Sequence, residues 1–175
     1  MLSKSGIEQY FLAEKNAGLL FLIIGIAGIV LTVVFFFFLK TGLYKGAAYV
    51  LIIAALVQLG VGYTIYSRSD QQRIDNVYAF DMNPGKLATN ELPRMEKAMS
   101  GIRVFMWIEL ALLVTGIALV FKNKPHPPAG IAHSLWAGVG IALIVQALLL
   151  AGADYFAYKR GKAYLEELRA FTTPK

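Results

Sequence analysis

The chain has 175 residues, of which 57% are hydrophobic and 16% are charged. Soluble domains carry about a quarter charged residues, so this chain has too little polar surface to cover a water-soluble globule. It has no cysteine, which excludes disulfides, thiolate metal sites, iron–sulfur clusters and a cysteine nucleophile. The formal net charge is +6. In a membrane protein, an excess of Lys and Arg first indicates which segments face the cytoplasm, so we interpret this charge as evidence on topology. We therefore expect no nucleic-acid partner.

Four apolar runs reach or approach the roughly 20 residues with which a helix spans a bilayer. They are continuous and rich in Leu, Ile, Ala and Gly, whereas the strands of a membrane barrel would be short and alternating. The first run is also longer than the apolar region of a signal peptide. The sequence predicts an all-α fold, a polytopic membrane four-helix bundle forming a single membrane domain over residues 1–175. The expected spans in the lipid bilayer are residues 17–39, 47–66, 104–121 and 131–158.

The distribution of Lys and Arg predicts the orientation of these spans. The N-terminal segment, the connection between the second and third runs and the C-terminal tail together hold 13 of them, and the two short connections hold 4. By the positive-inside rule, both termini and the long connection then face the cytoplasm. The prediction is a multi-pass inner-membrane protein with little structure on the outer side.

The two halves of the chain resemble each other. The stretch EKNAGLLFLI at Glu14 is similar to EKAMSGIRVF at Glu96, and LGVGYTIYSRS at Leu59 is similar to LAGADYFAYKRG at Leu150. Two tandem parallel hairpin repeats, related by an axis along the membrane normal, would produce this pattern. The biased composition of membrane helices is the alternative explanation.

The segments outside the apolar runs are predicted to continue the helices into the cytoplasm. Residues 67–103 form a helical connection with a turn at DMNPG, because Pro and Gly interrupt helices. Asn90 is expected to cap the helix that enters the third run. The tail, residues 159–175, extends the helix of the fourth run.

A carboxylate inside the third run is the sharpest candidate for function. Glu109 lies about five residues inside that run, and an ionisable residue within a span is a functional hypothesis by default. Asp154 lies near the cytoplasmic end of the fourth run, so we expect the two carboxyls at similar depth across the hairpin. Two close carboxyls can share a proton, or Arg103 could neutralise one of them. The structural alternative for Glu109 is a hydrogen bond to a neighbouring helix.

Other residues of the runs favour helix packing. Gln58 and Gln146 lie near the middles of the second and fourth runs, where each needs a hydrogen-bond partner; pairing between helices is the commoner role and substrate contact the rarer one. Tyr155 belongs to an aromatic belt at the cytoplasmic interface. Small residues let helices approach closely, and the glycines expected to do so are Gly18, Gly25, Gly28, Gly62 and Gly116.

Catalytic and metal-binding patterns are missing from the sequence. It contains no phosphate-binding loop, dinucleotide glycine pattern, HExxH or GxSxG motif. His126 and His133 are seven residues apart with two prolines between them, which does not match the spacing of helical metal ligands. We therefore predict no enzyme, no cofactor and no metal site.

Two functions of different classes remain open at this stage. The first is a non-enzymatic membrane protein that binds a membrane partner, as an accessory subunit or an immunity-type protein. The partner would be another copy of the chain, forming a homo-oligomer, or a different membrane protein. The second is an oligomeric channel or a proton- or cation-coupled transporter that uses Glu109 and Asp154. A lipid-modifying enzyme using the two carboxylates as acid and base ranks last, because no nucleophile accompanies them.

Overall fold

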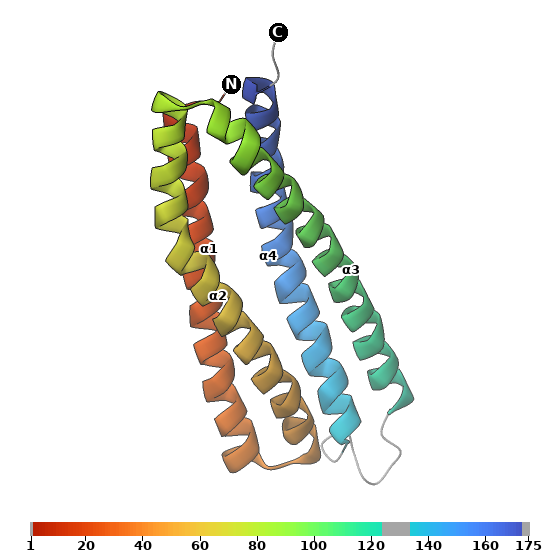
Figure 1. Ribbon diagram of the computed structural model, residues 1–175. Coiled ribbons are helices and arrows are strands. Elements are labelled where there is room, and N and C mark those ends of the chain that lie inside the picture. The colour runs from red at the N-terminus through yellow and green to blue at the C-terminus, as the bar shows by residue number, and fades with distance from the viewer. Residues whose placement is uncertain (1, 124–133, 173–175) are drawn as a thin grey trace. The chain divides into compact units, whose positions relative to one another are not determined.

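The computed structural model describes residues 2–123 and 134–172, and it is helical almost throughout them (Figure 1). The long helices are α1 (Lys4–Val33), α2 (Gly42–Met82), α3 (Leu92–Lys122) and α4 (Leu135–Thr172). Two π-helical segments, η1 (Val34–Leu39) and η2 (Leu87–Glu91), extend α1 at its end and α3 at its start. All four extended helices are long and apolar enough to cross a membrane, which confirms the predicted all-α class.

The ends of the helices follow local chemistry. Segment η1 stops at Lys40, whose φ of 56° is left-handed and whose amide donates to the Phe35 carbonyl at 3.2 Å. Helix α2 ends before Pro84, which cannot donate a backbone hydrogen bond but suits the first turn of a helix. The predicted cap at Asn90 is wrong, because Asn90 lies inside η2. The carbonyls of Asn83 and Pro84 already accept the first amides of the new helix.

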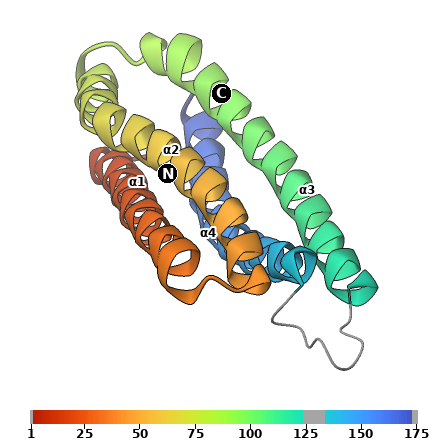
Figure 2. The same ribbon diagram turned by 90° about the horizontal axis from the view of Figure 1, so that it is seen from below.

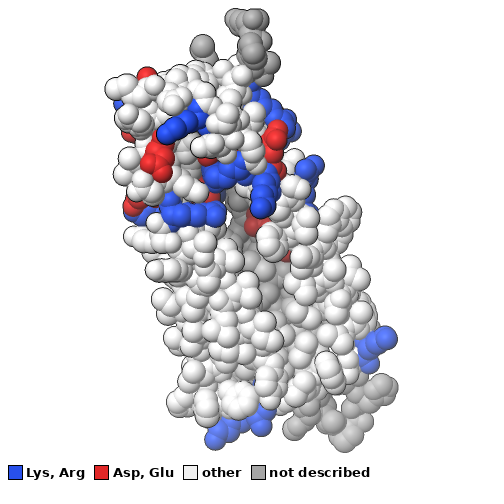
Figure 3. Space-filling view, viewed as in Figure 1, with Lys and Arg blue, Asp and Glu red and all other residues white. Residues whose placement is uncertain are grey.

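Contacts divide the chain into two compact units, and every long helix contributes to both. The charged unit comprises Met1–Leu19, Gly62–Met106 and Ala153–Lys175, and the apolar unit comprises Leu20–Val61 and Trp107–Gly152. The three segments that are richest in Lys and Arg therefore gather in one unit. Lys, Arg, Asp and Glu atoms crowd the surface of the charged unit in Figure 3.

The charged unit has a hydrophobic core of its own. Ile7 and Phe11 from α1, Leu87 from η2, Met95 from α3 and Leu168 from α4 are all fully buried in it. Ion pairs surround this core, including Lys4 with Asp81 at 2.7 Å. The segments that were expected to project as helices thus pack into a folded four-helix unit.

The apolar unit is built in the opposite way. Its buried positions are mostly small, such as Ala55, Ala137 and Ala147, while large apolar side chains such as Ile53 and Leu148 are more than half exposed. Small residues between helices and large ones outside are typical of helices that pack in lipid. Figure 2 shows α1 alongside α2.

Candidate functional site

Glu109 is a buried residue of the apolar unit, with 6% of its surface exposed. Its neighbours Ile108 and Leu110 are about half exposed, so the carboxylate points away from the outer surface of α3. Gly116 follows two turns later on the same face of α3. A Cβ atom at Gly116 would lie 2.7 Å from the carbonyl oxygen of Gly140. Glu109 therefore lies on the face of α3 that packs against α4.

The two glutamines of the apolar unit are hydrogen-bonded to each other. Gln58 on α2 and Gln146 on α4 are 3% and 5% exposed, and the Gln58 Nε2 donates to the Gln146 Oε1 at 3.2 Å. Val57 and Val145, the residues just before them, face outward. The pair joins α2 to α4 within an interior in which most of the other buried side chains are small and apolar, such as Ala55 and Ala147. This is the geometry of helix–helix association through polar side chains.

We expect the Gln58→Leu and Gln146→Leu variants each to be destabilised by about 1 kcal/mol, because each leaves one buried amide without its partner. The double variant should lose no more than either single variant, since both polar groups are then gone. Unfolding in mixed detergent micelles, followed by circular dichroism, gives the four free energies of the cycle. Fully additive losses would show that this hydrogen bond contributes no stability.

Three of the remaining candidates from the sequence belong to the charged unit. Arg103 and Tyr155 are exposed residues of the charged unit, and Asp154 is a partly buried residue of the same unit. Glu109 belongs to the apolar unit, so its pairing with Asp154 stays a prediction. His126 and His133 lie outside the described residues. Within the described ranges, no group of three or more His, Cys, Asp and Glu side chains could hold a metal ion.

The predicted glycines lie where helices approach closely. A Cβ atom would lie 2.8 Å from the Tyr66 amide at Gly18, 2.8 Å from the Leu59 Cγ at Gly25, and 3.1 Å from the Ala55 Cβ at Gly28. Gly62 supplies the carbonyl oxygen that a Cβ at Gly18 would also meet, at 3.0 Å. These contacts hold α1 against α2 in each unit.

A closer helix contact was missed from the sequence. A Cβ atom at Gly46 would overlap the carbonyl oxygen of Leu135, and one at Gly138 would overlap the carbonyl oxygen of Leu43. The two glycines thus let the first turns of α2 and α4 touch backbone to backbone. The contact is reciprocal, because each Leu-x-x-Gly turn presents its carbonyl to the glycine of the other. The repeated LYKG and LWAG stretches were the available signal.

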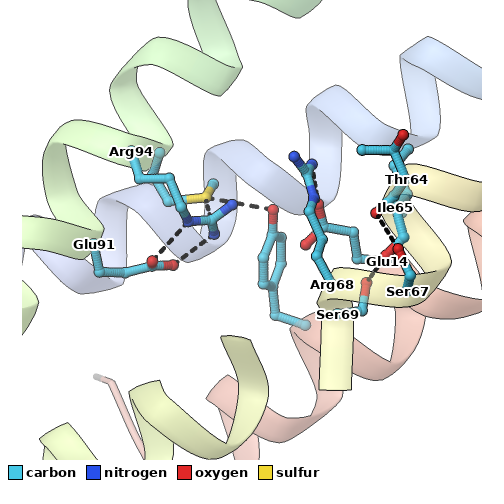
Figure 4. A network of polar contacts seen from close by, with 10 residues as sticks. Glu14, Thr64, Ile65, Ser67, Arg68, Ser69, Glu91 and Arg94 are labelled. Atoms are coloured by element: carbon cyan, nitrogen blue, oxygen red, sulfur yellow. Dashed lines mark hydrogen bonds and ion pairs between the residues drawn. The ribbon is translucent and has the colours of Figure 1, made fainter. Parts of the chain in front are cut away.

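An ion pair whose carboxylate is buried and whose arginine side chain is 25% exposed lies in the charged unit (Figure 4). The Arg94 Nε and Nη2 donate to the two carboxylate oxygens of Glu91, each at 2.7 Å. Asn76 on α2 adds a third hydrogen bond to Glu91 at 3.3 Å. Glu91 is buried, and the Arg94 guanidinium lies 5.4 Å from the ring centroid of Phe11 on α1. The pair therefore links the start of α3 to α1 and α2.

Two stacked tyrosines extend this network to α4. The rings of Tyr10 and Tyr164 lie 4.2 Å apart and nearly parallel, and the Tyr10 hydroxyl donates to the Met95 sulfur at 3.4 Å. Burial raises the pKa of both hydroxyls, and the negative charge of Glu91 raises that of Tyr164 further. Both rings therefore stay neutral at physiological pH. They act as packing groups with a polar edge, since neither hydroxyl can serve as a base there.

The pKa of Arg94 reflects its contact with Glu91. Burial on its own lowers the pKa of Arg94, but the hydrogen bonds and charge of Glu91 outweigh burial and raise it. Beside it, Arg68 lies 3.4 Å from Glu14, joining α2 to α1 (Figure 4). The i, i+3 spacing of Glu91 and Arg94 was visible in the sequence. The burial of Glu91 was not visible in the sequence, because it depends on the packing of four helices around the core of the charged unit.

Comparisons with protein families, with curated proteins and with solved structures found no match to this chain.

Proposed function

We propose that this chain is a small non-enzymatic multi-pass inner-membrane protein that acts by binding a membrane partner, as an accessory subunit or an immunity-type protein. One observation carries the proposal. The charged unit has its own hydrophobic core and a buried ion pair between Glu91 and Arg94. A unit held in this way can present a fixed surface to a partner outside the bilayer.

Burial and charge support the membrane placement. Large apolar side chains cover the outside of the apolar unit, and each helix contains an 18-residue stretch of mean hydropathy between 2.0 and 3.0. In this proposal lipid covers that surface. The segments that hold most of the Lys and Arg residues lie together in the charged unit, and by the positive-inside rule this supports a cytoplasmic position for this unit and both termini.

The same proposal includes two tandem parallel hairpin repeats, α1–α2 and α3–α4. When Tyr63 of LGVGYTIYSRS is aligned with Tyr155 of LAGADYFAYKRG, the same spacing also aligns the LYKG turn of α2 with the LWAG turn of α4. Those two turns make the reciprocal contact of Gly46 and Gly138. A two-fold relation between equivalent helices produces reciprocal contacts of this kind, which supports the repeat.

The second candidate is an oligomeric channel or a proton- or cation-coupled transporter that uses Glu109 and Asp154. The burial of Glu109 within the apolar unit favours it, because buried carboxylates in spans are often functional. The mutual hydrogen bond of Gln58 and Gln146 favours the binding function, since it uses two further buried polar side chains of that unit to join helices.

One variant separates the two functions. We expect liposomes that contain the parent protein or the Glu109→Gln variant to take up protons no faster than protein-free liposomes, as measured by a trapped pH-sensitive dye. Both proteins should also co-purify the same membrane protein from the native host. Proton or cation flux in the parent that falls at least about tenfold in the variant would overturn the binding function and favour the second candidate.

A further inference from the structure

The two hairpins of the chain differ in how the basic residues of the charged unit are neutralised close to the apolar runs. In the first hairpin, α1–α2, Lys15 forms an ion pair with Asp70, and Arg68 lies 3.4 Å from Glu14. In the second hairpin, α3–α4, the basic residues nearest the apolar runs take part in none of the ion pairs among the described residues. These residues are Arg103 of α3 and Lys159 and Arg160 of α4. Their charges are therefore available to a partner outside the chain.

The likeness of the two halves shows how this difference arises. In the alignment of LGVGYTIYSRS with LAGADYFAYKRG, Arg68 corresponds to Arg160. In the alignment of the two EK stretches, Glu14, which pairs with Arg68, corresponds to Glu96. Glu96 lies 2.7 Å from Arg169, so its carboxylate pairs with a residue further along α4. Arg160 is thereby left without the carboxylate that its counterpart has.

Two contacts between α3 and α4 place the unpaired basic residues at one height. A Cβ atom at Gly161 would lie 2.7 Å from the Met99 Sδ, and the helices run in opposite directions. Arg103 comes four residues after Met99, so it is level with the residue four before Gly161, residue 157. The ion pair of Glu96 with Arg169 gives residue 162 by the same count over seven residues. The two basic residues of α4 fall between these two positions.

This height corresponds to the lipid headgroups in the proposed orientation. Arg103 directly precedes the third apolar run, and Lys159 and Arg160 directly follow the fourth. At 1.5 Å per residue, all three lie within about 3 Å of the ends of those runs. The headgroup layer on each side of the hydrocarbon core is roughly 5–7 Å thick. The three basic side chains therefore lie in the layer that contains the phosphate groups.

Each of these basic residues has an exposed aromatic ring one helical turn nearer the apolar run. Residues four apart lie on the same face of a helix, so each ring lies beneath its basic side chain. The pairs are Arg103 with Trp107, Lys159 with Tyr155, and Arg160 with Phe156, whose rings are 73%, 56% and 60% exposed. A lipid phosphate held by the basic group would place its glycerol and upper chain carbons against the ring, as aromatic residues at membrane interfaces do.

We propose that the cytoplasmic end of the α3–α4 hairpin binds the phosphate group of an anionic phospholipid, through Arg103 and Arg160 with Lys159 beside them. This inference rests on the proposed function, because it takes the membrane placement of the chain as its premise. Guanidinium groups donate two parallel hydrogen bonds to phosphate oxygens, which gives them geometric selectivity for such a ligand. A zwitterionic lipid is attracted less, because its ammonium group compensates the phosphate charge.

Brominated lipids test this site, because bromine quenches the fluorescence of a tryptophan that it contacts. The chain has two tryptophans, and the Trp136→Phe variant leaves Trp107, one turn from Arg103, as the single reporter. In liposomes of full-length protein, brominated phosphatidylglycerol should be preferred at Trp107 over brominated phosphatidylcholine by about fivefold or more. Each basic residue near a membrane surface contributes roughly a factor of five to such a preference.

Two double variants in this background separate the site from the overall charge. Arg103→Gln with Arg160→Gln should reduce the preference for phosphatidylglycerol by about fivefold or more. Lys86→Gln with Lys97→Gln removes the same charge from exposed positions more than one helical turn before the third apolar run, and it should keep the parental preference. Circular dichroism of each variant identifies any that does not fold.

Three outcomes overturn the lipid site. They are equal quenching by the two lipids in the parent, equal effects of the two double variants, and loss of the preference on addition of millimolar glycerol 3-phosphate. The last would assign the site to soluble phosphate esters. The proposed function survives each of them if the chain resists alkaline carbonate extraction from host membranes. A chain that carbonate releases would contradict the proposed function itself.

Discussion

Replacing Gly46 or Gly138 with alanine is expected to destabilise the apolar unit by roughly 3 kcal/mol or more, which is large for one methyl group. The added Cβ would overlap a backbone carbonyl oxygen of the facing helix, on Leu135 for the first and on Leu43 for the second. A backbone carbonyl cannot rotate away from the added Cβ as a flexible side chain could, so α2 and α4 must move apart over several turns. Detergent-induced unfolding monitored by circular dichroism measures the loss.

The chain supplies matched controls for this experiment. A Cβ atom at Gly60 on α2 or at Gly152 on α4 meets nothing within 4 Å. The Gly60→Ala and Gly152→Ala variants should match the parent or gain up to about 1 kcal/mol, because alanine favours helix over glycine. If Gly46→Ala proves as stable as Gly60→Ala, the close contact of the two helices is not present in the membrane protein.

The Arg94→Ala variant is expected to lose about 3–5 kcal/mol from the stability of the charged unit. It would leave the Glu91 carboxylate buried without the two 2.7 Å hydrogen bonds that compensate its burial. Hydrogen exchange across residues 62–106 should rise strongly, while the apolar unit keeps its protection. A double replacement, Glu91→Leu with Arg94→Leu, should recover most of the loss, because a buried pair stabilises little relative to apolar residues.

A surface ion pair provides the control for Arg94. Lys162 and Glu166 lie 3.9 Å apart on α4, and both side chains are more than half exposed. Exposed pairs contribute at most about 0.5 kcal/mol, so Lys162→Ala should leave both stability and exchange near parental values. Equal effects at Arg94 and Lys162 would show that the first pair is solvated and does not hold the unit together.

These results would also bear on function. If loss of Arg94 loosens the charged unit but leaves the apolar unit intact, the protein can stay in the membrane while losing the surface that we propose binds a partner. A stability defect confined to one unit, joined to loss of partner capture, would locate binding in that unit.

Much of the fold was predictable from composition and patterning. Continuous apolar runs of about 20 residues can satisfy their backbone groups only as helices in lipid, so the four long helices followed directly. The start of α3 was not predicted correctly. Asn90 is a residue type that often caps helices, but the turn at Asn83 and Pro84 begins the helix before it. Two local signals for a helix start occur here, and the helix begins at the one that comes first in the chain.

The sequence identified which polar residues need a hydrogen-bond or ionic partner, but it did not identify the partners. Glu109, Gln58 and Gln146 stood out because polar groups are costly in an apolar run. That Gln58 bonds Gln146 depends on α2 lying against α4, a contact made by Gly46 and Gly138 and absent from the order of the helices along the chain. Likewise, Glu91 and Arg94 are ordinary surface residues by their sequence. They become a buried pair only because the ends of four helices converge on a core, and burial depends on distant segments that no local pattern records.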